Sequence, residues 1–580
     1  MASSVEDVLD EILNRRIAKQ DALESFKALP EAQRERMLAS LRERLENSEP
    51  DQKPMQAQEL RSLHEMNIGA EQLSAIDAWT KEYALRVPRS KDNAQRHQTY
   101  FVDQRKTAGL KRPLKALQFQ LTYERAEGAY IYDVDGNRYV DLTGDNGVNL
   151  FGHQPEFMKQ ALIERLHRGY PLVAYSEDLF EAARLFCELT GHERMVFTQS
   201  GTEAVMWAVR IARAATGRKK LVILDGSYHG LSDAVLAFRD RKGGSMSAGL
   251  GMLQEFADQL IILDYGNVDQ LQQIEAAADD IAAVLVEPIQ SRFPSRQPLE
   301  YLRSLRTLTL EKGIVLVFDE MVTGFRAGPR GAEGFFKVKP DLSTYGKVAG
   351  GGMPTGIIAG LSKYMDYVDG GTWGFDDASM PSLRRTMMAG THTQNSLKIS
   401  ATLAVCREMQ RICGPGPACD GVSCECSLGR ISKQTTALAS EANAYFAEKR
   451  VPLLTEHFSS LFRFQVTDDP FGLTRELFFF LLRLQGVETS TSGNCFLTTA
   501  HTDADLREVM DAVKNSVDRM LEHGFFAAAE LAEVQTVAAP AAAPIQTEPA
   551  HLVLSSATDP MQELKRLILA DLQVAGAGVR

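Results

Sequence analysis

Short, continuous apolar runs dominate the middle of this chain and limit the folds that it can adopt. Five of them lie between residues 194 and 320: RMVFTQ, KLVILD, QLIILD, IAAVLVEP and GIVLVFDE. They are rich in β-branched residues and do not alternate with polar ones, which is typical of strands buried on both faces. Helical patterns such as TEAVMWAVRIARAA and LEYLRSLRTLTLEK separate several of the runs. This texture predicts an α/β fold whose central sheet is mainly parallel.

The texture changes near both ends of the chain. Short amphipathic helices at the two ends are separated from a long α/β segment by a polar stretch, ENSEPDQKPMQAQ, and by an Ala/Pro stretch, VAAPAAAPIQTEPA. The α/β segment ends with a predicted helix that has Thr502 or Asp503 as its cap. The predicted parts are a helical N-terminal appendage (1–50), a linker (51–74), the main domain (75–525), an Ala/Pro-rich linker (526–558) and a C-terminal helix (559–580).

Composition excludes some classes of protein. The chain has 580 residues and a net charge of −12, which argues against nonspecific binding to nucleic acid. It has no apolar run long enough to span a bilayer. The N-terminus, MASSVEDVLDEILNRRIAKQ, lacks the basic region and apolar run of a signal peptide. We therefore expect a cytoplasmic protein without a membrane or nucleic-acid partner.

One lysine stands in an unusual setting. Lys347 lies in DLSTYGKVAGGGMPTG, among small residues and five glycines that would leave room for a ligand. A solvated lysine needs no such clearing, whereas a lysine that bonds covalently to a bulky planar group does. Desolvation near positive charge lowers the pKa of an ammonium group and makes the amine nucleophilic. Since most lysines are simply solvated, this segment is informative only together with other motifs.

A second motif, TQSGTEA, lies between a predicted strand and a predicted helix. Ser200, Gly201 and Thr202 occupy the start of that helix. Hydroxyl groups and free amides there favour an anion such as phosphate, and a glycine lets the backbone approach closely. A simple helix cap explains the same residues equally well.

Two more motifs follow predicted strands, at the edge where open α/β sheets bind ligands. Tyr228 and His229 come after the strand that ends at Asp225. An aromatic side chain there could stack on a planar ring or simply cover the sheet edge. Asp319 ends a very apolar strand, so its charge needs a cationic partner, either a protonated pyridine nitrogen or a structural ion pair. Lys347 follows Asp319 by 28 residues.

The order of these motifs fits one cofactor. Pyridoxal phosphate needs a phosphate anchor, an aromatic cover, a carboxylate that keeps its ring nitrogen protonated, and a covalent lysine. The chain resembles the class III, fold-type I aminotransferases over about residues 120–520. The resemblance is carried by YIYDVDGNRYVDL, GHQPEF, SGTEAV, SYHG, VEPIQ, FDEMVTGFR, YGKVAGGGMPTG and GTHTQNS. It implies a large domain with a mainly parallel sheet and a smaller α+β domain.

The resemblance implies a role for each matching residue. It implies that Lys347 binds the cofactor covalently and that Asp319 pairs with the ring nitrogen. These two are the implied catalytic residues. Tyr228 would stack on the ring, and Met321 would pack on its opposite face. The resemblance also implies that Ser200, Gly201 and Thr202 bind the phosphate. The remaining cofactor-binding residues that it implies are His229, next to Tyr228 in SYHG, Glu287 in the surrounding shell, and Thr391, which reaches the phosphate of a neighbouring subunit.

Thr391 therefore implies a homodimer with shared active sites. The overall layout is similar to that of glutamate-1-semialdehyde aminomutases. Two stretches, RSKDNAQRHQTYFVDQR and TSGNCFLTTAHTDADL, instead resemble aminotransferase domains of hybrid polyketide/nonribosomal peptide synthetases. Those domains take nitrogen from an amino acid donor, here expected to be glutamate, and convert a carrier-bound 3-oxoacyl group to a 3-aminoacyl group.

Several alternatives stay open from the sequence. An aminomutase would move the amino group within one small molecule and need no donor, while a non-catalytic scaffold would not need the lysine and aspartate. Racemases and decarboxylases share the same cofactor residues. Arg326 and Arg463 are candidates for binding the substrate carboxylate.

The segment CGPGPACDGVSCECS interrupts the resemblance. The related proteins run directly from one helix to the next at this point. Zinc sites favour paired cysteines two to four residues apart, whereas the closest pair here, Cys424 and Cys426, is separated by one residue and has no histidine nearby. We interpret the segment as an inserted surface loop and expect no metal site.

Overall fold

A seven-stranded sheet forms the centre of the larger part of the protein, in a computed structural model that describes residues 68–526 except 109, 241–242, 415–418, 468, 470–471 and 491–492. The strand order is β4-β12-β11-β10-β9-β5-β8. All neighbours are parallel except β12, which runs antiparallel to both β11 and β4. The predicted α/β class with a mainly parallel sheet is therefore confirmed.

Each of the five apolar runs forms one strand of this sheet. They are β4 (Arg194–Thr198), β5 (Lys220–Leu224), β8 (Leu260–Leu263), β9 (Ile281–Val286) and β10 (Val315–Asp319). The two remaining strands, which no apolar run predicted, are β11 (Leu342–Tyr345) and β12 (Gly356–Gly360). A separate hairpin joins β6 (Ala237–Arg239) to β7 (Ser245–Ser247).

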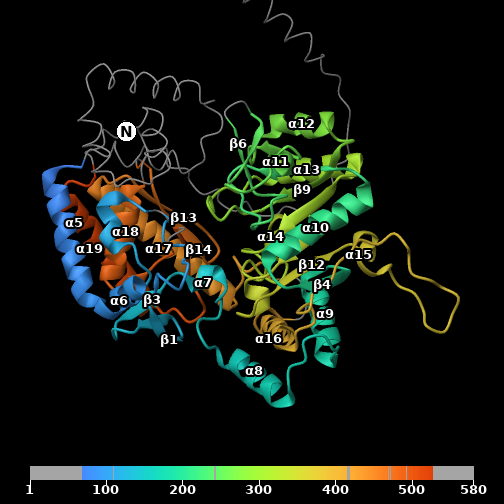
Figure 1. The fold of residues 1–580 in the computed structure, drawn as a ribbon, viewed down its shortest axis with the longest axis horizontal. Helices are drawn as coiled ribbons and strands as arrows, with labels where there is room; N and C mark the ends of the chain where they lie inside the picture. The colour runs from blue at the N-terminus through green and yellow to red at the C-terminus, as the bar shows by residue number, and fades with distance from the viewer. Residues whose placement is uncertain are drawn as a thin grey trace, which may run out of the picture. The chain divides into compact units, whose positions relative to one another are not determined.

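Helices cover both faces of the sheet (Figure 1). The two expected helices are α10 (Gly201–Thr216) and α13 (Leu299–Lys312). Alternate residues of one strand point to opposite layers: Leu316 and Phe318 pack in the layer of α13, whereas Val315 and Val317 pack in the layer of α10. This explains why the strands are continuously apolar. The other helices of this part are α8 (Glu156–Arg168), α9 (Glu177–Thr190), α11 (Gln254–Ala257), α12 (Leu271–Ala276), α14 (Gly331–Phe336), α15 (Ser362–Asp369) and α16 (Ser396–Cys413).

A smaller α+β part is built from both ends of the described chain. Its sheets are β1-β2-β3-β15 and β13-β14-β16. Its strands are β1 (Tyr123–Glu127), β2 (Tyr130–Asp133), β3 (Arg138–Asp141), β13 (Leu453–Phe458), β14 (Leu461–Val466), β15 (Val487–Glu488) and β16 (Asn494–Phe496). Its helices are α5 (Ala70–Arg86), α6 (Pro88–His97), α7 (Gly144–Gly147), α17 (Ser427–Lys449), α18 (Leu473–Leu484) and α19 (Asp503–Glu522).

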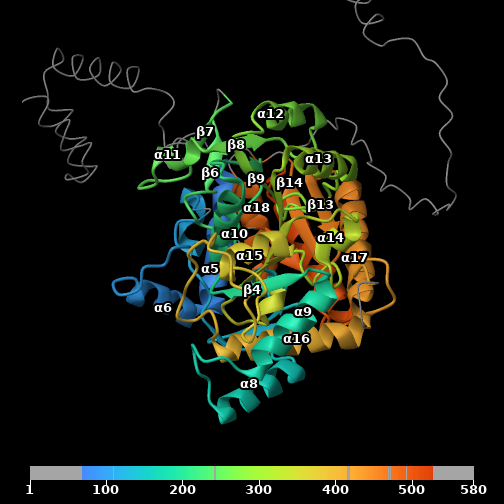
Figure 2. The ribbon, with the colours of Figure 1, turned by 90° about the vertical axis from the view of Figure 1, so that its right-hand side faces the viewer.

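The first and last described helices, α5 and α19, lie side by side (Figure 1). Trp79 of α5 packs on Phe525 with ring centroids 5.5 Å apart, and Arg519 of α19 pairs with Glu82 at 2.5 Å. Figure 2 shows the same layers after a quarter turn, with α8 at the lower edge, α16 above it and α17 at the right-hand edge. The two ends of the domain thus share one apolar core.

The boundaries differ slightly from the sequence-based ones. Helix α5 begins at Ala70, inside the segment interpreted as a linker, because Ala75, Ile76 and Trp79 give it a buried face. Thr502 is the N-cap of α19 and accepts a hydrogen bond from the amide of Asp505. The predicted appendages at 1–50 and 559–580, and both linkers apart from residues 68–74 and 526, lie outside the described residues. Of the helices that the structure describes, none is long and apolar enough to cross a membrane.

Candidate active site

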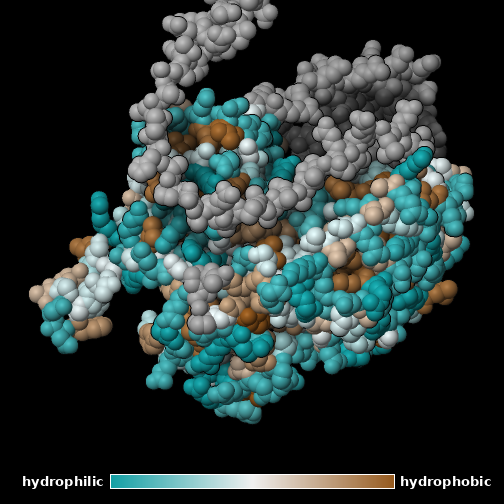
Figure 3. All heavy atoms as spheres, turned by 180° about the vertical axis from the view of Figure 1, so that it is seen from behind, coloured by the Kyte–Doolittle hydropathy of each residue, from teal (hydrophilic) through white to brown (hydrophobic). Residues whose placement is uncertain are grey.

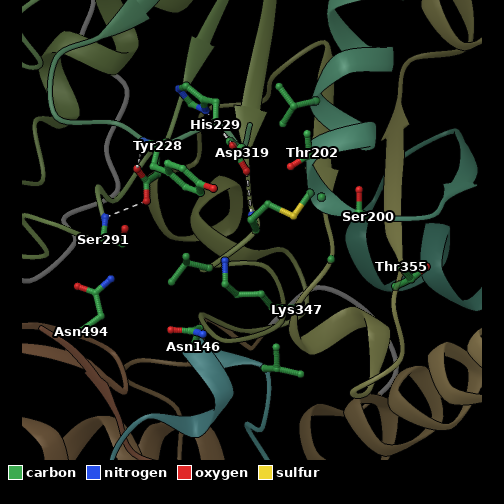
Figure 4. A pocket seen from close by; sticks show the side chains of 18 of the residues that line it. Asn146, Ser200, Thr202, Tyr228, His229, Ser291, Asp319, Lys347, Thr355 and Asn494 are labelled. Carbon is green, nitrogen blue, oxygen red and sulfur yellow. Dashed lines mark hydrogen bonds and ion pairs between the residues drawn. The ribbon is translucent and has the colours of Figure 1, made fainter. Parts of the chain in front are cut away.

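The polar motifs that follow separate strands meet at one cavity of about 760 Å³. It lies between the carboxyl edge of the parallel strands, where open α/β sheets bind ligands, and the elements α7, β14 and β16 of the smaller part. Nine of the ten predicted site residues line it: Ser200, Gly201, Thr202, Tyr228, His229, Glu287, Asp319, Met321 and Lys347. Figure 4 shows most of these side chains converging from different elements.

Asp319, the last residue of β10, is buried and has three hydrogen-bond donors. His229 Nδ1 lies 2.8 Å from its Oδ2. The amide of Met321 and the hydroxyl of Thr344 donate to Oδ1 at 3.2 and 3.3 Å. A proton on Nδ1 of His229 fits this arrangement, because an ionised carboxylate can only accept. Among the described residues, Nε2 of His229 has no hydrogen-bond partner. The carboxylate is therefore held in one orientation at the cavity wall.

Lys347 follows β11 and directs its amino group into the cavity (Figure 4). Burial lowers the pKa of this ammonium group below its ordinary value, and the charge of Arg326 acts in the same direction. The carboxylates of Asp319 and Glu287 oppose this shift without overcoming it. The amine is thus more readily deprotonated than a solvated lysine, which is the property that a covalent nucleophile needs.

The glycines around Lys347 serve the protein backbone as well as a ligand. A Cβ on Gly350 would lie 2.6 Å from the Thr355 methyl carbon, so this glycine permits close packing and leaves no empty room. Gly352 lines the cavity and has nothing within 4 Å of the position of its missing Cβ. The expectation that the glycines clear space for a ligand therefore fits Gly352 and does not fit Gly350.

Met321 lies between two backbone segments of the site. A Cβ added to Gly201 would lie 2.8 Å from its sulfur, and a Cβ added to Gly346 would lie at the same distance. An added methyl group at either glycine would therefore make the flexible end of Met321 shift. The two glycines thus let Met321 occupy its present position between the start of α10 and Lys347.

The start of α10 combines a helix cap with free donors. Ser200 is the N-cap, and its hydroxyl accepts from the amide of Glu203 at 3.2 Å. The hydroxyl of Thr202 accepts from the amide of Leu231 at 3.3 Å. The first amides of the helix, of Gly201 and Thr202, have no intrahelical partner, as at every helix start. The capping interpretation and the anion-binding interpretation are thus compatible.

Glu287 is buried behind Tyr228. Its two carboxylate oxygens accept from the amides of Tyr228 and Ser291, at 3.2 and 2.8 Å. Burial raises the pKa of this carboxyl group, and the charge of Asp319 adds to the shift. Glu287 thus fixes the backbone that carries the Tyr228 ring, which projects into the cavity (Figure 4).

The two candidate arginines differ in position. Arg326 is buried outside the cavity and donates to the carbonyls of Val322 and Gly147 and to the hydroxyl of Ser460. It is a structural residue, so the idea that it binds a substrate carboxylate directly is wrong. Arg463 lines the cavity and donates to Asn494 Oδ1 at 2.7 Å.

Some cavity residues were not predicted. Asn146, Arg292 and Asn494 also line it. Arg292 comes five residues after Glu287, and Asn494 lies in the quoted stretch TSGNCFLTTAHTDADL, so their neighbourhood carried a signal. Asn146 lies in α7 with a left-handed backbone conformation, and no sequence pattern predicted its place at the cavity. Thr391, the tenth predicted residue, is exposed and does not line the cavity of its own chain.

The cysteine-rich segment differs from its interpretation as a plain surface loop. The sulfur atoms of Cys413, Cys419 and Cys426 lie within 4.8 Å of one another, and Cys424 contacts two of them. Spacing along the sequence did not reveal this cluster because Cys413, at the end of α16, and Cys426, at the N-cap of α17, are far apart in the chain and meet only through the fold.

The arrangement in the cavity fits pyridoxal phosphate. A partly deprotonated buried amine can react with its aldehyde, a buried carboxylate can pair with its protonated ring nitrogen, and the start of α10 can hold its phosphate. Neither a structural ion pair nor a helix cap alone would require these three groups to meet in one cavity.

Comparison with known proteins gives the same answer. Residues 113–411 match the family model "Aminotransferase class-III". A glutamate-1-semialdehyde 2,1-aminomutase of Archaeoglobus fulgidus is 31% identical over 427 residues, 70% of this chain and 96% of that protein. A β-phenylalanine aminotransferase from Variovorax paradoxus has a similar structure, with a TM-score of 0.64 and 26% identity over 77% of this chain and 98% of its own.

The fold likeness extends to more distant structures. A glutamate-1-semialdehyde aminomutase from Pseudomonas aeruginosa PAO1 gives a TM-score of 0.66 at 20% identity, over 77% of this chain and 98% of its own. From the motifs, the cavity and these comparisons together, we conclude that the chain belongs to the class III aminotransferases, pyridoxal-phosphate-dependent enzymes of fold-type I.

Proposed function

We propose that this enzyme moves an amino group from an amino acid, glutamate being the expected donor, to the ketone of a carrier-bound 3-oxoacyl thioester. The observation that carries the amino-transfer chemistry is the meeting of Lys347 and the Asp319–His229 pair in one cavity. When bound, pyridoxal phosphate withdraws electrons from the carbon that bears the amino group.

In this proposal, Lys347 holds the cofactor covalently and carries the proton between substrate atoms. Asp319 keeps a proton on the ring nitrogen. His229 is a positioning residue that fixes Asp319 through the 2.8 Å contact. The lowered pKa of Lys347 supports its role, because the amine must be neutral to react with a carbonyl.

The other predicted residues would bind and orient the cofactor. Ser200, Gly201 and Thr202 would hold its phosphate at the positive end of α10. Tyr228 and Met321 would contact its two ring faces. Glu287 would act indirectly, through the amide of Tyr228.

A homodimer with shared sites is part of the proposal. The loop between α15 and α16 projects away from the neighbouring helices (Figure 1), and tan to brown atoms occur on the same projection seen from behind (Figure 3). Its exposed apolar side chains are Trp373, Phe375, Met380, Leu383 and Met387. Exposed apolar side chains on one projecting loop favour burial against another chain. Thr391 follows directly, so it would reach the cavity of the partner subunit.

The substrate assignment is supported by the residues that line the cavity. Asn494 and Phe496 line the cavity and belong to the stretch that resembles synthetase-embedded domains. Arg292 and Arg463 offer positive charge to a donor carboxylate. A carrier arm would raise the effective concentration of the ketone. A cytoplasmic location and the domain boundaries given above belong to the same proposal; the seven free cysteines favour a reducing compartment.

The test is the intact mass of a 3-oxoacyl carrier protein after incubation with enzyme and glutamate. We expect the mass change of ketone to amine with the donor present, and no change without the donor or with Lys347→Ala. A carrier that stays a ketone with every common amino acid donor contradicts the carrier-bound substrate.

The second candidate is an intramolecular aminomutase. The relative from Archaeoglobus fulgidus is named glutamate-1-semialdehyde 2,1-aminomutase, and this chain covers 96% of its length. This reaction needs no external donor. Isomerisation of glutamate-1-semialdehyde without a donor, together with an unchanged carrier, would replace the first proposal by the second.

A further inference from the structure

Four cysteines converge between α16 and α17. Cys413 is the last residue of α16, and Cys426 is the N-cap of α17. Cys419 and Cys424 come from the connection between them. We call Cys413, Cys419, Cys424 and Cys426 the four-cysteine cluster. None of its members lines the active-site cavity.

Three of the four sulfur atoms, those of Cys413, Cys419 and Cys426, lie within 4.8 Å of one another. The fourth, Cys424 Sγ, lies 3.3 Å from that of Cys419 and 2.6 Å from that of Cys426, and the last two are 3.5 Å apart. Four thiolates around zinc, with Zn–S bonds of about 2.3 Å, lie about 3.8 Å apart in a tetrahedron. The first three sulfurs are close to this arrangement, and Cys424 would move away from Cys426 on binding the ion. Iron–sulfur clusters spread their cysteines over several iron atoms, which such short separations do not allow.

Three backbone amides face sulfur atoms of the cluster. The amide of Gly421 faces the sulfur of Cys419, and the amides of Leu428 and Gly429 face that of Cys426. The last two belong to the first turn of α17, whose positive end stabilises anions. A metal-bound set of four thiolates carries a net charge of −2, so these amides would stabilise it.

The loop is held firmly against the catalytic domain. Gly421 has φ +62°, and a Cβ there would lie 2.1 Å from the amide nitrogen of Gly328. The carboxylate of Asp420 accepts from the amides of Val422 and Cys424, at 3.0 and 3.2 Å. The ligand positions are thus set by the fold, as in a structural metal site and unlike a free surface loop.

We propose that the four-cysteine cluster binds one structural Zn²⁺ ion. Binding forms four Zn–S bonds, and the four thiols lose their protons to solvent. Because α16 packs on the larger part and α17 belongs to the smaller one, the ion would tie together the two helices that connect the two parts. The role is structural, since four protein ligands leave no open position for a substrate.

The experiment measures metal in the tag-free holoenzyme after exhaustive dialysis. We expect one zinc per chain by elemental mass spectrometry, and tetrahedral thiolate–cobalt absorption after exchange with Co²⁺. The Cys424→Ser variant should lose the metal or hold it far more weakly than the wild type. The Cys424→His variant should bind the metal, because histidine can replace the lost ligand. The control Cys187→Ser, outside the cluster, should keep the metal. If a serine variant does not fold, metal content and the cobalt spectrum of the wild type still decide.

Three outcomes overturn the proposal. The first is a metal-free protein whose seven thiols all react with iodoacetamide in denaturant without prior reduction. The second is a loss of two hydrogens that maps to a disulfide within the cluster. The third is zinc that remains, at one per chain, when Cys419 and Cys424 are both replaced by serine.

Discussion

Nδ1 of His229 lies 2.8 Å from Oδ2 of Asp319, and both side chains are buried at the wall of the active-site cavity. The histidine, one amide and one hydroxyl group all donate to this carboxylate. Such a set of donors fixes the orientation of the carboxylate. The carboxylate is therefore prepared for a cationic partner in the cavity before any ligand arrives.

Replacing Asp319 by Asn should reduce turnover much more than cofactor affinity. A neutral amide cannot stabilise a protonated ring nitrogen, so we expect kcat to fall by on the order of 10²-fold or more. Steady-state kinetics and cofactor titration measure the two effects. Asp225→Asn, at an exposed position directly after strand β5 of the same sheet, is the control and should behave as wild type. Near-normal kcat in a folded Asp319→Asn enzyme contradicts the role.

Lys347 should be the residue that carries the cofactor. After borohydride reduction and digestion, we expect the cofactor mass on the peptide that contains Lys347, and no adduct in Lys347→Ala. The control is Lys363→Ala, which removes an exposed lysine of α15 and should leave the adduct unchanged. An adduct on a different lysine of the wild-type enzyme would show that the assignment is wrong.

Cofactor uptake by the apoenzyme should depend on pH through Lys347. Only the neutral amine reacts, and its lowered pKa means that the neutral form predominates from a pH below 10.5, the ordinary value. The rate of reconstitution should therefore rise with pH, and the midpoint of this rise should lie below pH 10.5. Since the charge of Asp319 raises the pKa of Lys347, the midpoint should move to lower pH in Asp319→Asn. A midpoint at 10.5 or a shift to higher pH contradicts this electrostatic account.

The two arginines should respond differently to substitution. Arg463→Gln should raise the KM of an amino acid donor about 10-fold or more, because a charge-assisted contact is lost, and leave the KM of a donor without a carboxylate unchanged. Arg326→Gln should instead destabilise the fold by about 1.5–3 kcal/mol, since it breaks a buried set of charge-assisted hydrogen bonds. Kinetics and thermal unfolding separate the two effects. Equal KM changes for both donors would exclude Arg463 as the carboxylate partner.

Thr391 should act on the partner subunit. If it does, a heterodimer of Thr391→Ala and Lys347→Ala chains has both lesions in one site, and its other site is wholly wild type. Activity should therefore reappear when the two inactive or weakened proteins are mixed and exchanged. Confirmed heterodimers with no regained activity would place the role of Thr391 within its own chain or exclude it.

Parts of this structure could be predicted from sequence because local pattern and tertiary environment agree. The runs that became β9 and β10 are buried on both faces, so their continuous apolar character reports their position directly. β11 and β12 escaped prediction. The sequence LSTY of β11 is half polar, and GIIAG of β12 is short and bounded by glycine. Their strand conformation depends on the neighbours that they pair with.

The site shows the same division. Lys347 and Asp319 were recognisable because each lies in a motif that makes little sense without a ligand. Asn146 and Asn494 were not, because they reach the cavity only when the smaller part packs against the sheet. The prediction for Arg326 was wrong for a related reason. It lies in the same motif as Asp319, but its side chain points into the protein and donates a hydrogen bond to Ser460, 134 residues away in the chain.

The position of Met321 between Gly201 and Gly346 couples substitutions at positions that are distant in the sequence. The three atoms nearest to a Cβ on Gly201 all belong to the methionine side chain, at 2.8 to 3.7 Å. Alanine at position 201 would therefore push the flexible end of Met321 out of its present position beside Lys347, whereas a shorter side chain at position 321 would leave room for the added methyl group. The effects of substituting Gly201 and Met321 should thus be non-additive, although the two residues lie 120 positions apart in the chain.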